Sequence, residues 1–180
     1  MRIVCVVSLL SLLVPAVASA QSGAPSVSLQ AAAGPTLVDP GYNVSAAVGF
    51  SPLSRVTLFL DVQRTHLSSR TTRGDDGSSA FRGGTMTAVS GEVRVGLWPA
   101  HRVTPYVLAG LGAGKSRPNV NETFPVAVTN DTRFAFLGGG VHVPLRDGLS
   151  VFGDARILLG EEANELLVML PVRVGVAWRF

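Results

Sequence analysis

Apolar and polar residues alternate with a period of two along most of this chain, and this alternation limits the folds open to it. In the stretch 55–63, for example, Val56, Leu58, Leu60 and Val62 share one parity, while mostly polar residues hold the other. Such alternation is typical of strands whose two faces meet different surroundings, and not of helices. Eight segments show it, and the predicted strands are Ser26–Val38, Tyr42–Phe50, Arg55–Leu67, Thr85–Trp98, Pro105–Lys115, Arg133–Val143, Leu149–Leu159 and Leu166–Phe180.

The connections between these segments alternate in length. Short ones such as "SPLS" and "PLRDG" contrast with long polar ones over 68–84 and 116–131. Tight turns at one end and long loops at the other are typical of transmembrane barrels. A membrane excludes open sheet edges, so the strands must close. The sequence therefore predicts an all-β fold, an eight-stranded antiparallel up-and-down transmembrane β-barrel over residues 21–180, with the apolar parity facing lipid.

A soluble eight-stranded barrel is the alternative, in which the apolar parity would face inward. The parity that would then face water is too poor in charge, because it includes Gly96, Gly112, Gly114, Gly175 and Ala177. Aromatic residues also gather at the turn-side ends of segments, as a membrane-interface girdle requires. Trp98 and Phe152 share the parity of charged residues, so either the strands bulge there or the two rings point into the barrel mouth. The aromatic residues in question are Phe50, Trp98, Tyr106, Phe152, Trp178 and Phe180.

The first twenty residues have the pattern of a secretory signal peptide. Arg2 precedes a long apolar run, and "VASA" provides small residues for cleavage before Gln21. A membrane anchor helix is the alternative, but the run of about 15 residues is shorter than the roughly 20 needed, and Pro15 interrupts it. The only cysteine, Cys5, lies in this segment, so no disulfide or cysteine metal site is expected after cleavage. The small positive net charge does not favour nucleic acid as a partner.

Three stretches carry a family resemblance: "PYVLAGLGAG", "FAFLGGGVHVPL" and the final "VRVGVAWRF". They resemble the outer membrane β-barrel superfamily of Gram-negative bacteria, which includes the OmpA-like transmembrane domain and the opacity-type porin-like proteins. The resemblance implies localisation in the outer membrane, contact with its lipids and lipopolysaccharide, and assembly by the outer membrane insertion machinery. That machinery reads a last strand of alternating apolar residues ending in an aromatic residue, and the matching residues are Val174, Val176, Trp178 and Phe180.

Charged residues of the lumen parity form the first candidate site. Buried charges are costly unless they pair, so Glu92 is expected to pair with Arg94 or Arg173, and Asp154 with Arg156 or Arg173. The network would either fill and stiffen the lumen or gate a narrow pore. Its members are Asp61, Glu92, Arg94, Asp154, Arg156 and Arg173, with Arg179 near the periplasmic mouth.

The long loop over 68–84 supplies the candidate contact residues for surface partners. Polar loops on a rigid barrel suit binding of a host surface, a phage or anionic lipopolysaccharide, although a solvated loop without a partner has the same composition. The candidates are Arg70, Arg73, Asp75, Asp76 and Arg82.

Two motifs suggest chemistry, and neither is convincing. "AGLGAGKS" is close to a phosphate-binding loop but suits a barrel strand, because no helix can follow it before Pro118. His66 and Ser68 resemble the His-x-Ser site of lipid A deacylase barrels, although Ser69 replaces the expected asparagine. We therefore expect a non-enzymatic outer membrane barrel with a structural or surface-interaction role and no cofactor or metal. A narrow small-solute or ion channel and a lipid A-modifying hydrolase are the alternatives.

Overall fold

The computed structural model describes residues 25–38, 40–73, 79–98, 102–119, 129–162 and 165–180, and for residues 69–73, 79–82, 162 and 165 it describes the backbone alone. The expected signal peptide, residues 1–20, lies outside this part of the chain. Among the described residues no helix is long and apolar enough to cross a membrane, a finding that does not bear on strands.

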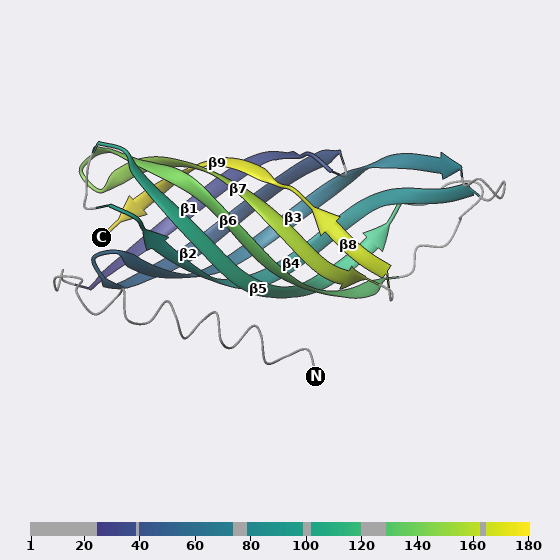
Figure 1. Ribbon diagram of the computed structural model, residues 1–180, viewed down its shortest axis with the longest axis horizontal. Helices are drawn as coiled ribbons and strands as arrows, with labels where there is room; N and C mark the ends of the chain where they lie inside the picture. Colours follow the sequence, from purple (N-terminus) through teal and green to yellow (C-terminus); the bar gives the residue numbers. More distant parts are fainter. Residues whose placement is uncertain (1–24, 39, 74–78, 99–101, 120–128, 163–164) are drawn as a thin grey trace.

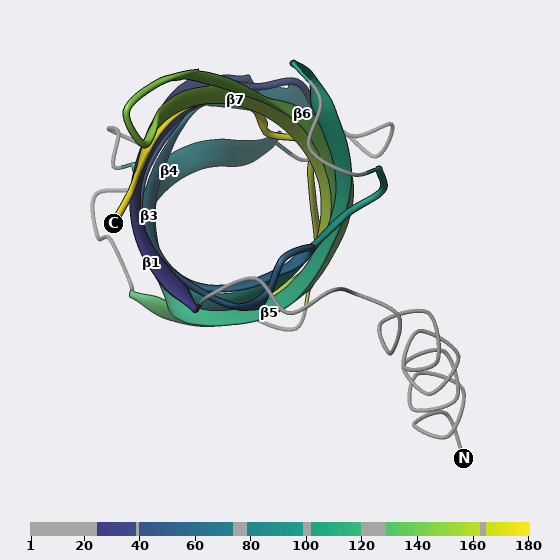
Figure 2. The same cartoon turned by 90° about the vertical axis from the view of Figure 1, so that its left-hand side faces the viewer.

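Antiparallel strands that pair with their neighbours along the chain form a closed barrel (Figures 1 and 2). From β1 to β8 each strand pairs with the next along the chain, and β9 pairs with β7 on one side and with β1 on the other. The predicted eight-stranded up-and-down barrel is therefore confirmed. The strands are β1 (Ser26–Thr36), β2 (Gly41–Leu53), β3 (Val56–Arg73), β4 (Ser79–Gly96), β5 (Thr104–Pro118), β6 (Asn130–Arg146), β7 (Leu149–Glu162), β8 (Glu165–Met169) and β9 (Val172–Arg179).

The short strands β8 and β9 are two parts of the eighth barrel strand. Both pair with β7 in one continuous register, since Leu158 faces Met169 and Ala155 faces Val172. Pro171 separates them, because proline has no amide hydrogen to donate to a ladder. The carbonyl of Pro171 still accepts the amide of Arg156 at 3.0 Å, which keeps the strand in place.

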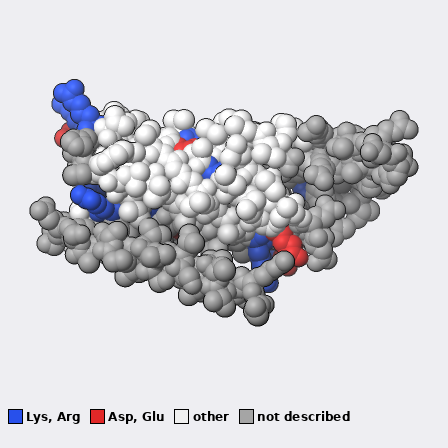
Figure 3. All heavy atoms as spheres, viewed as in Figure 1, with Lys and Arg blue, Asp and Glu red and all other residues white. Residues whose placement is uncertain are grey.

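The apolar parity faces outward, which is the reverse of the soluble-barrel alternative. Leu60, Leu111 and Leu137, which lie on three different strands, are 60–70 % exposed. The residues of the other parity on the same strands are mostly buried or half-buried. The wall seen in Figure 3 is mostly uncharged: a few charged atoms show near its middle, and larger charged groups lie nearer its two ends. An outward apolar band of this kind is what a lipid-facing barrel requires.

The predicted aromatic girdle is only partly correct. Phe50, Trp98 and Trp178 are about half exposed, at 47 %, 58 % and 49 %. Tyr106 and Phe152 are instead 3 % exposed and point into the barrel. Both share the inward parity of their strands, and parity outweighs their position near the strand ends.

Strands β3 and β4 extend beyond the other strands as a hairpin at the loop end (Figure 1). Their pairing continues from Arg70 opposite Arg82 to Arg73 opposite Ser79, after a register shift between Leu67 and Arg70. Part of the segment expected to be a loop over 68–84 is therefore strand. The loop candidates Asp75 and Asp76 lie outside the described residues.

The β6–β7 connection is a two-residue hairpin turn at the opposite end. Asp147 and Gly148 both have positive φ, 42° and 81°. This is the backbone of a type I′ turn, for which Asp-Gly is a favoured sequence. The β6–β7 turn therefore lies at the end of the barrel opposite the extended strands β3 and β4, as predicted (Figure 1).

Candidate functional site in the barrel interior

Six buried charged residues form a network across the lumen, and we call it the lumen ion-pair network. They come from four strands: β3, β4, β7 and β9. None is more than 8 % exposed. The six residues that were predicted from their shared lumen parity therefore lie together in the structure. They are Asp61, Glu92, Arg94, Asp154, Arg156 and Arg173.

Arg173 of β9 joins two acids on different walls. Its Nε lies 3.0 Å from Asp154 Oδ1 and its Nη2 lies 3.0 Å from Asp154 Oδ2, a two-point contact. Its Nη1 lies 3.0 Å from Asp61 Oδ2 and also donates to Ser45 Oγ at 3.0 Å. β9 and β3 are separated in the barrel by β1 and β2, so the Arg173–Asp61 pair crosses the interior.

Arg156 of β7 continues the network toward β4. Its Nη2 lies 2.7 Å from Glu92 Oε2, and its Nε lies 3.0 Å from Asp154 Oδ1. Glu92 Oε1 in turn accepts from Arg94 Nη2 at 2.9 Å. The ion pairs therefore run as one chain, Arg94–Glu92–Arg156–Asp154–Arg173–Asp61.

Charge balance explains why this cluster can be buried. Three arginines face three carboxylates, and every member has a partner of opposite sign within 3.0 Å. An unpaired charge in such an interior would cost several kcal/mol, whereas a hydrogen-bonded and neutral set recovers most of that cost. The pairs Glu92–Arg94 and Asp154–Arg173 are among those expected. The pairs Glu92–Arg156 and Asp61–Arg173 were not expected.

Aromatic rings surround Arg94 at the turn-side end of the network. Its guanidinium carbon lies 4.4 Å from the ring centres of Phe59 and Tyr106 and 5.3 Å from that of Phe152. Tyr106 also donates its hydroxyl to Asp154 Oδ2 at 3.2 Å. Such cation–π contacts gain strength where water is excluded. The sequence reasoning missed the role of these rings, although each shares the parity of its strand's inward residues.

Glycines on β5 make room for two further rings. Phe134 and Phe136 of β6 are 5 % exposed and lie opposite Gly112 and Gly110. A Cβ atom added at either glycine would collide with the facing ring. The series Leu108, Gly110, Gly112 therefore alternates inward so that large side chains of the next strand can cross the lumen.

Polar side chains line the interior on the loop side of the network. Asn43 donates to Thr65 Oγ1 at 2.7 Å, and both are almost fully buried. Among the described residues, Asn43 Oδ1, Asp61 Oδ1, Ser90 Oγ and Thr132 Oγ1 have no hydrogen-bond partner. Buried acceptors of this kind are commonly bonded to ordered water, so this part of the lumen suits hydration.

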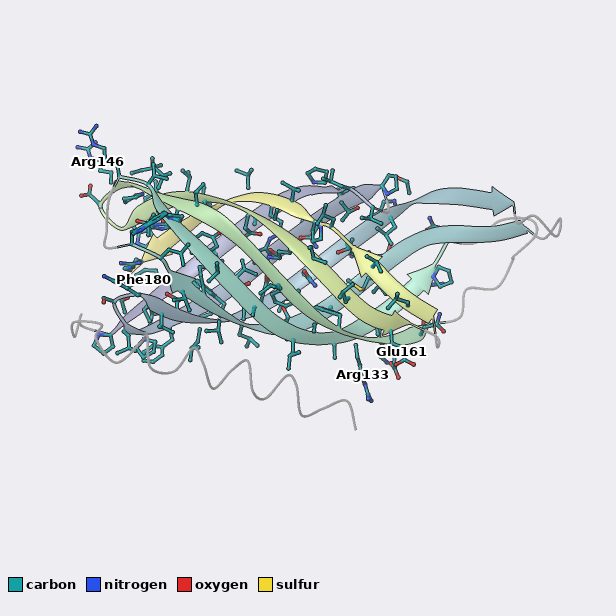
Figure 4. The ribbon with its side chains drawn as sticks, viewed as in Figure 1. Arg133, Arg146, Glu161 and Phe180 are labelled. Atoms are coloured by element: carbon teal, nitrogen blue, oxygen red, sulfur yellow. The ribbon has the colours of Figure 1, made fainter. Side chains whose placement is uncertain are left out.

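The other sequence candidates lie outside the lumen. On β9, Val174, Val176 and Trp178 face outward and are 68 %, 50 % and 49 % exposed. Phe180 follows them, 70 % exposed, with its ring centre 6.5 Å from that of Trp178 (Figure 4). Arg179 is exposed near the mouth and takes no part in the network. The side chains of Arg70, Arg73 and Arg82 lie outside the described part, as do Asp75 and Asp76.

His66 shows no arrangement for hydrolysis. Its ring packs against Tyr42, with centres 5.2 Å apart, and its Nδ1 lies 3.4 Å from Thr85 Oγ1. Within the described residues no carboxylate orients it, and no group of three metal-ligating side chains occurs anywhere. A serine hydrolase needs an oriented base beside its nucleophile.

Comparison with solved structures supports the architecture. Neisserial surface protein A matches with a TM-score of 0.65 and 12 % identity, over 88 % of this chain and 98 % of that chain. The N-terminal β-barrel domain of Pseudomonas aeruginosa OprF matches with a TM-score of 0.56 and 17 % identity, over 86 % and 97 %.

A major outer membrane protein from Thermus thermophilus matches with a TM-score of 0.56 and 20 % identity, over 88 % of this chain and 100 % of that chain. No family model and no curated protein sequence matches this chain. The chain has the fold of the eight-stranded outer membrane β-barrels.

Proposed function

We propose that this chain is an integral outer membrane protein whose barrel is a closed, stiff scaffold, with a structural or surface-interaction role. The observation that carries the proposal is the lumen ion-pair network. Its six charged side chains tie β3, β4, β7 and β9 together across the interior. A scaffold of this kind holds its outer loops in fixed positions, which suits contact with other molecules.

The aromatic rings add to the closure of the lumen. Phe59, Tyr106 and Phe152 surround Arg94, and Phe136 lies 5.1 Å from the guanidinium of Arg156. Eight-stranded barrels have interiors just wide enough for side chains to fill. In this proposal the lumen is closed by charged side chains packed among aromatic rings, which leave no path for a diffusing solute.

Conductance in planar bilayers tests this function. We expect the purified full chain to give no steady current steps, and Glu92→Gln to leave the bilayer silent, because the rings around Arg94 remain in place. Arg146→Gln is the matched control, since that side chain lies exposed at a turn, 87 % accessible. Reproducible steps from the unmodified chain would overturn the closed-barrel proposal.

A narrow channel is the second candidate, and one observation favours it. Arg156 is shared by Glu92 and Asp154, and it approaches Asp61 at 3.9 Å. A guanidinium with several acids in reach can exchange partners, and such an exchange could open a path for small ions. In this case the unmodified chain would conduct, and Arg156→Gln would change the step size.

The hydrolase alternative receives no support from the geometry of His66, so the proposed role is non-enzymatic. Assembly by the outer membrane insertion machinery, guided by the outward residues of β9 and by Phe180, belongs to the same proposal. Export through a cleaved signal peptide over residues 1–20 remains a prediction.

A further inference from the structure

Three basic residues lie on the outward face of the barrel wall at its loop end. Arg64 follows Val62 on β3, and Lys115 and Arg117 follow Leu111 on β5 in the same outward parity. All three are exposed, and we call them the basic wall patch. Cations are costly at the centre of the lipid face and much less so at its border. The patch therefore marks the level at which the wall leaves the hydrocarbon.

Strand register brings these residues together around two threonines of β4. Arg64 lies opposite Thr87, which lies opposite Lys115. In the next outward row, His66 lies opposite Thr85, which lies opposite Arg117. Neighbouring strands are about 4.8 Å apart, so the Cα atoms of Arg64 and Lys115 are about 10 Å apart. Side chains as long as these can reach one small anion placed over Thr87.

The patch has an excess of positive charge. Among the described residues the two rows contain one carboxylate, that of Asp131 on β6, which lies opposite Lys115, so the three basic residues outnumber it. Among the described residues no ion pair involves Arg64, Lys115 or Arg117. Arg133 of β6 differs from these three basic residues, because it lies opposite an acidic residue, Glu161 of β7, on the outward face at the same end of the barrel (Figure 4).

We propose that the basic wall patch binds a phosphate group of lipopolysaccharide. The inference rests on the proposed function, because the loop end faces the outer leaflet only if the barrel sits in an outer membrane. Arginine and lysine form charge-assisted hydrogen bonds with phosphate oxygens, and threonine hydroxyls add neutral donors. Below the patch, Val62 and Leu111 offer 51 % and 70 % exposed apolar surfaces to the acyl chains.

Binding to the refolded full chain in zwitterionic detergent micelles tests the proposal. The probes are lipopolysaccharide with its lipid A phosphates, the same material dephosphorylated, and phosphatidylglycerol. We expect the triple variant Arg64→Gln/Lys115→Gln/Arg117→Gln to bind phosphorylated lipopolysaccharide at least about tenfold more weakly. The matched control Arg133→Gln, which leaves the patch intact, should change the affinity less than about twofold.

Several results would overturn the proposal. Unchanged affinity of the triple variant, or an equal loss with Arg133→Gln, would mean that the patch is not a site. Equal binding of the dephosphorylated material would exclude phosphate as the recognised group, and equal binding of phosphatidylglycerol would make the occupant a phospholipid.

Folding of each variant is checked by heat-modifiable gel mobility. If the triple variant does not fold, Arg117→Gln alone replaces it, with an expected loss of about threefold and the same overturning outcomes. Conductance is measured on the same preparations. A silent barrel without phosphate selectivity would overturn the site and leave the proposed function standing, whereas a conducting barrel that retains phosphate-selective binding would overturn the closed barrel and leave the site standing.

Discussion

At the level of single residues, a small inward residue on one strand lies beside a large inward side chain on the next strand. Gly112 faces the ring of Phe134, and a Cβ atom at Gly112 would meet that ring and the side chain of Ser90. Gly91 on β4 is different, because nothing lies within 4 Å of a Cβ atom added there. The same residue type therefore has a packing role at an inward position and none at an outward one.

Replacing Gly112 by alanine should lower the free energy of unfolding by about 1–3 kcal/mol, because an overpacked interior forces its neighbours to shift. Denaturant titration in detergent, followed by tryptophan fluorescence, measures the change. Gly91→Ala is the matched control and should have little effect. Adding Phe134→Leu to Gly112→Ala should recover part of the loss, and no recovery would contradict the proposed contact.

At the scale of elements, the eighth strand combines two tasks. Its inward residues include Arg173, which ties the strand to β3 and β7, while its outward residues continue the apolar band. Pro171 interrupts the ladder without changing the register with β7. The strand thus closes the barrel and also presents the outward series that ends at Trp178 and Phe180.

Phe180→Ala should lower the fraction of the chain inserted in outer membranes, if this residue belongs to the assembly signal. The fraction is measured by heat-modifiable mobility in isolated membranes of an expressing cell. Phe50→Ala is the matched control, because Phe50 is also an exposed aromatic residue, at 47 %, near the turn end of the barrel. Equal losses for both variants would indicate a general girdle effect and contradict a specific signal.

At the scale of the whole molecule, the lumen ion-pair network joins walls that are distant in the sheet order. Arg173 pairs with Asp154 and with Asp61, so it links β9 with β7 and β3. The barrel is closed by its backbone ladder and braced from within by these pairs. Loss of one arginine should therefore affect the stability of the entire barrel.

Arg173→Met should lower the free energy of unfolding by about 3–5 kcal/mol, because it leaves buried carboxylates without their partner. Urea unfolding of the reconstituted barrel measures the effect. Arg146→Met should change the stability little, since Arg146 and Asp147 form a pair at 3.6 Å whose side chains are both 87 % exposed. A second variant with Asp61 and Asp154 also neutralised should recover part of the loss, and its failure to do so would contradict this explanation.

The number of strands and the two faces of each strand could be predicted from the sequence, because alternation and turn residues are local properties of the chain. Membership of the charged interior group followed from the same parity. Which charged partners meet could not be predicted in this way: the pairs Glu92–Arg156 and Asp61–Arg173 depend on the register at which distant strands close. Pairing also grouped Arg64 with Lys115 across β4, since cross-strand neighbours are set by register and not by distance along the chain.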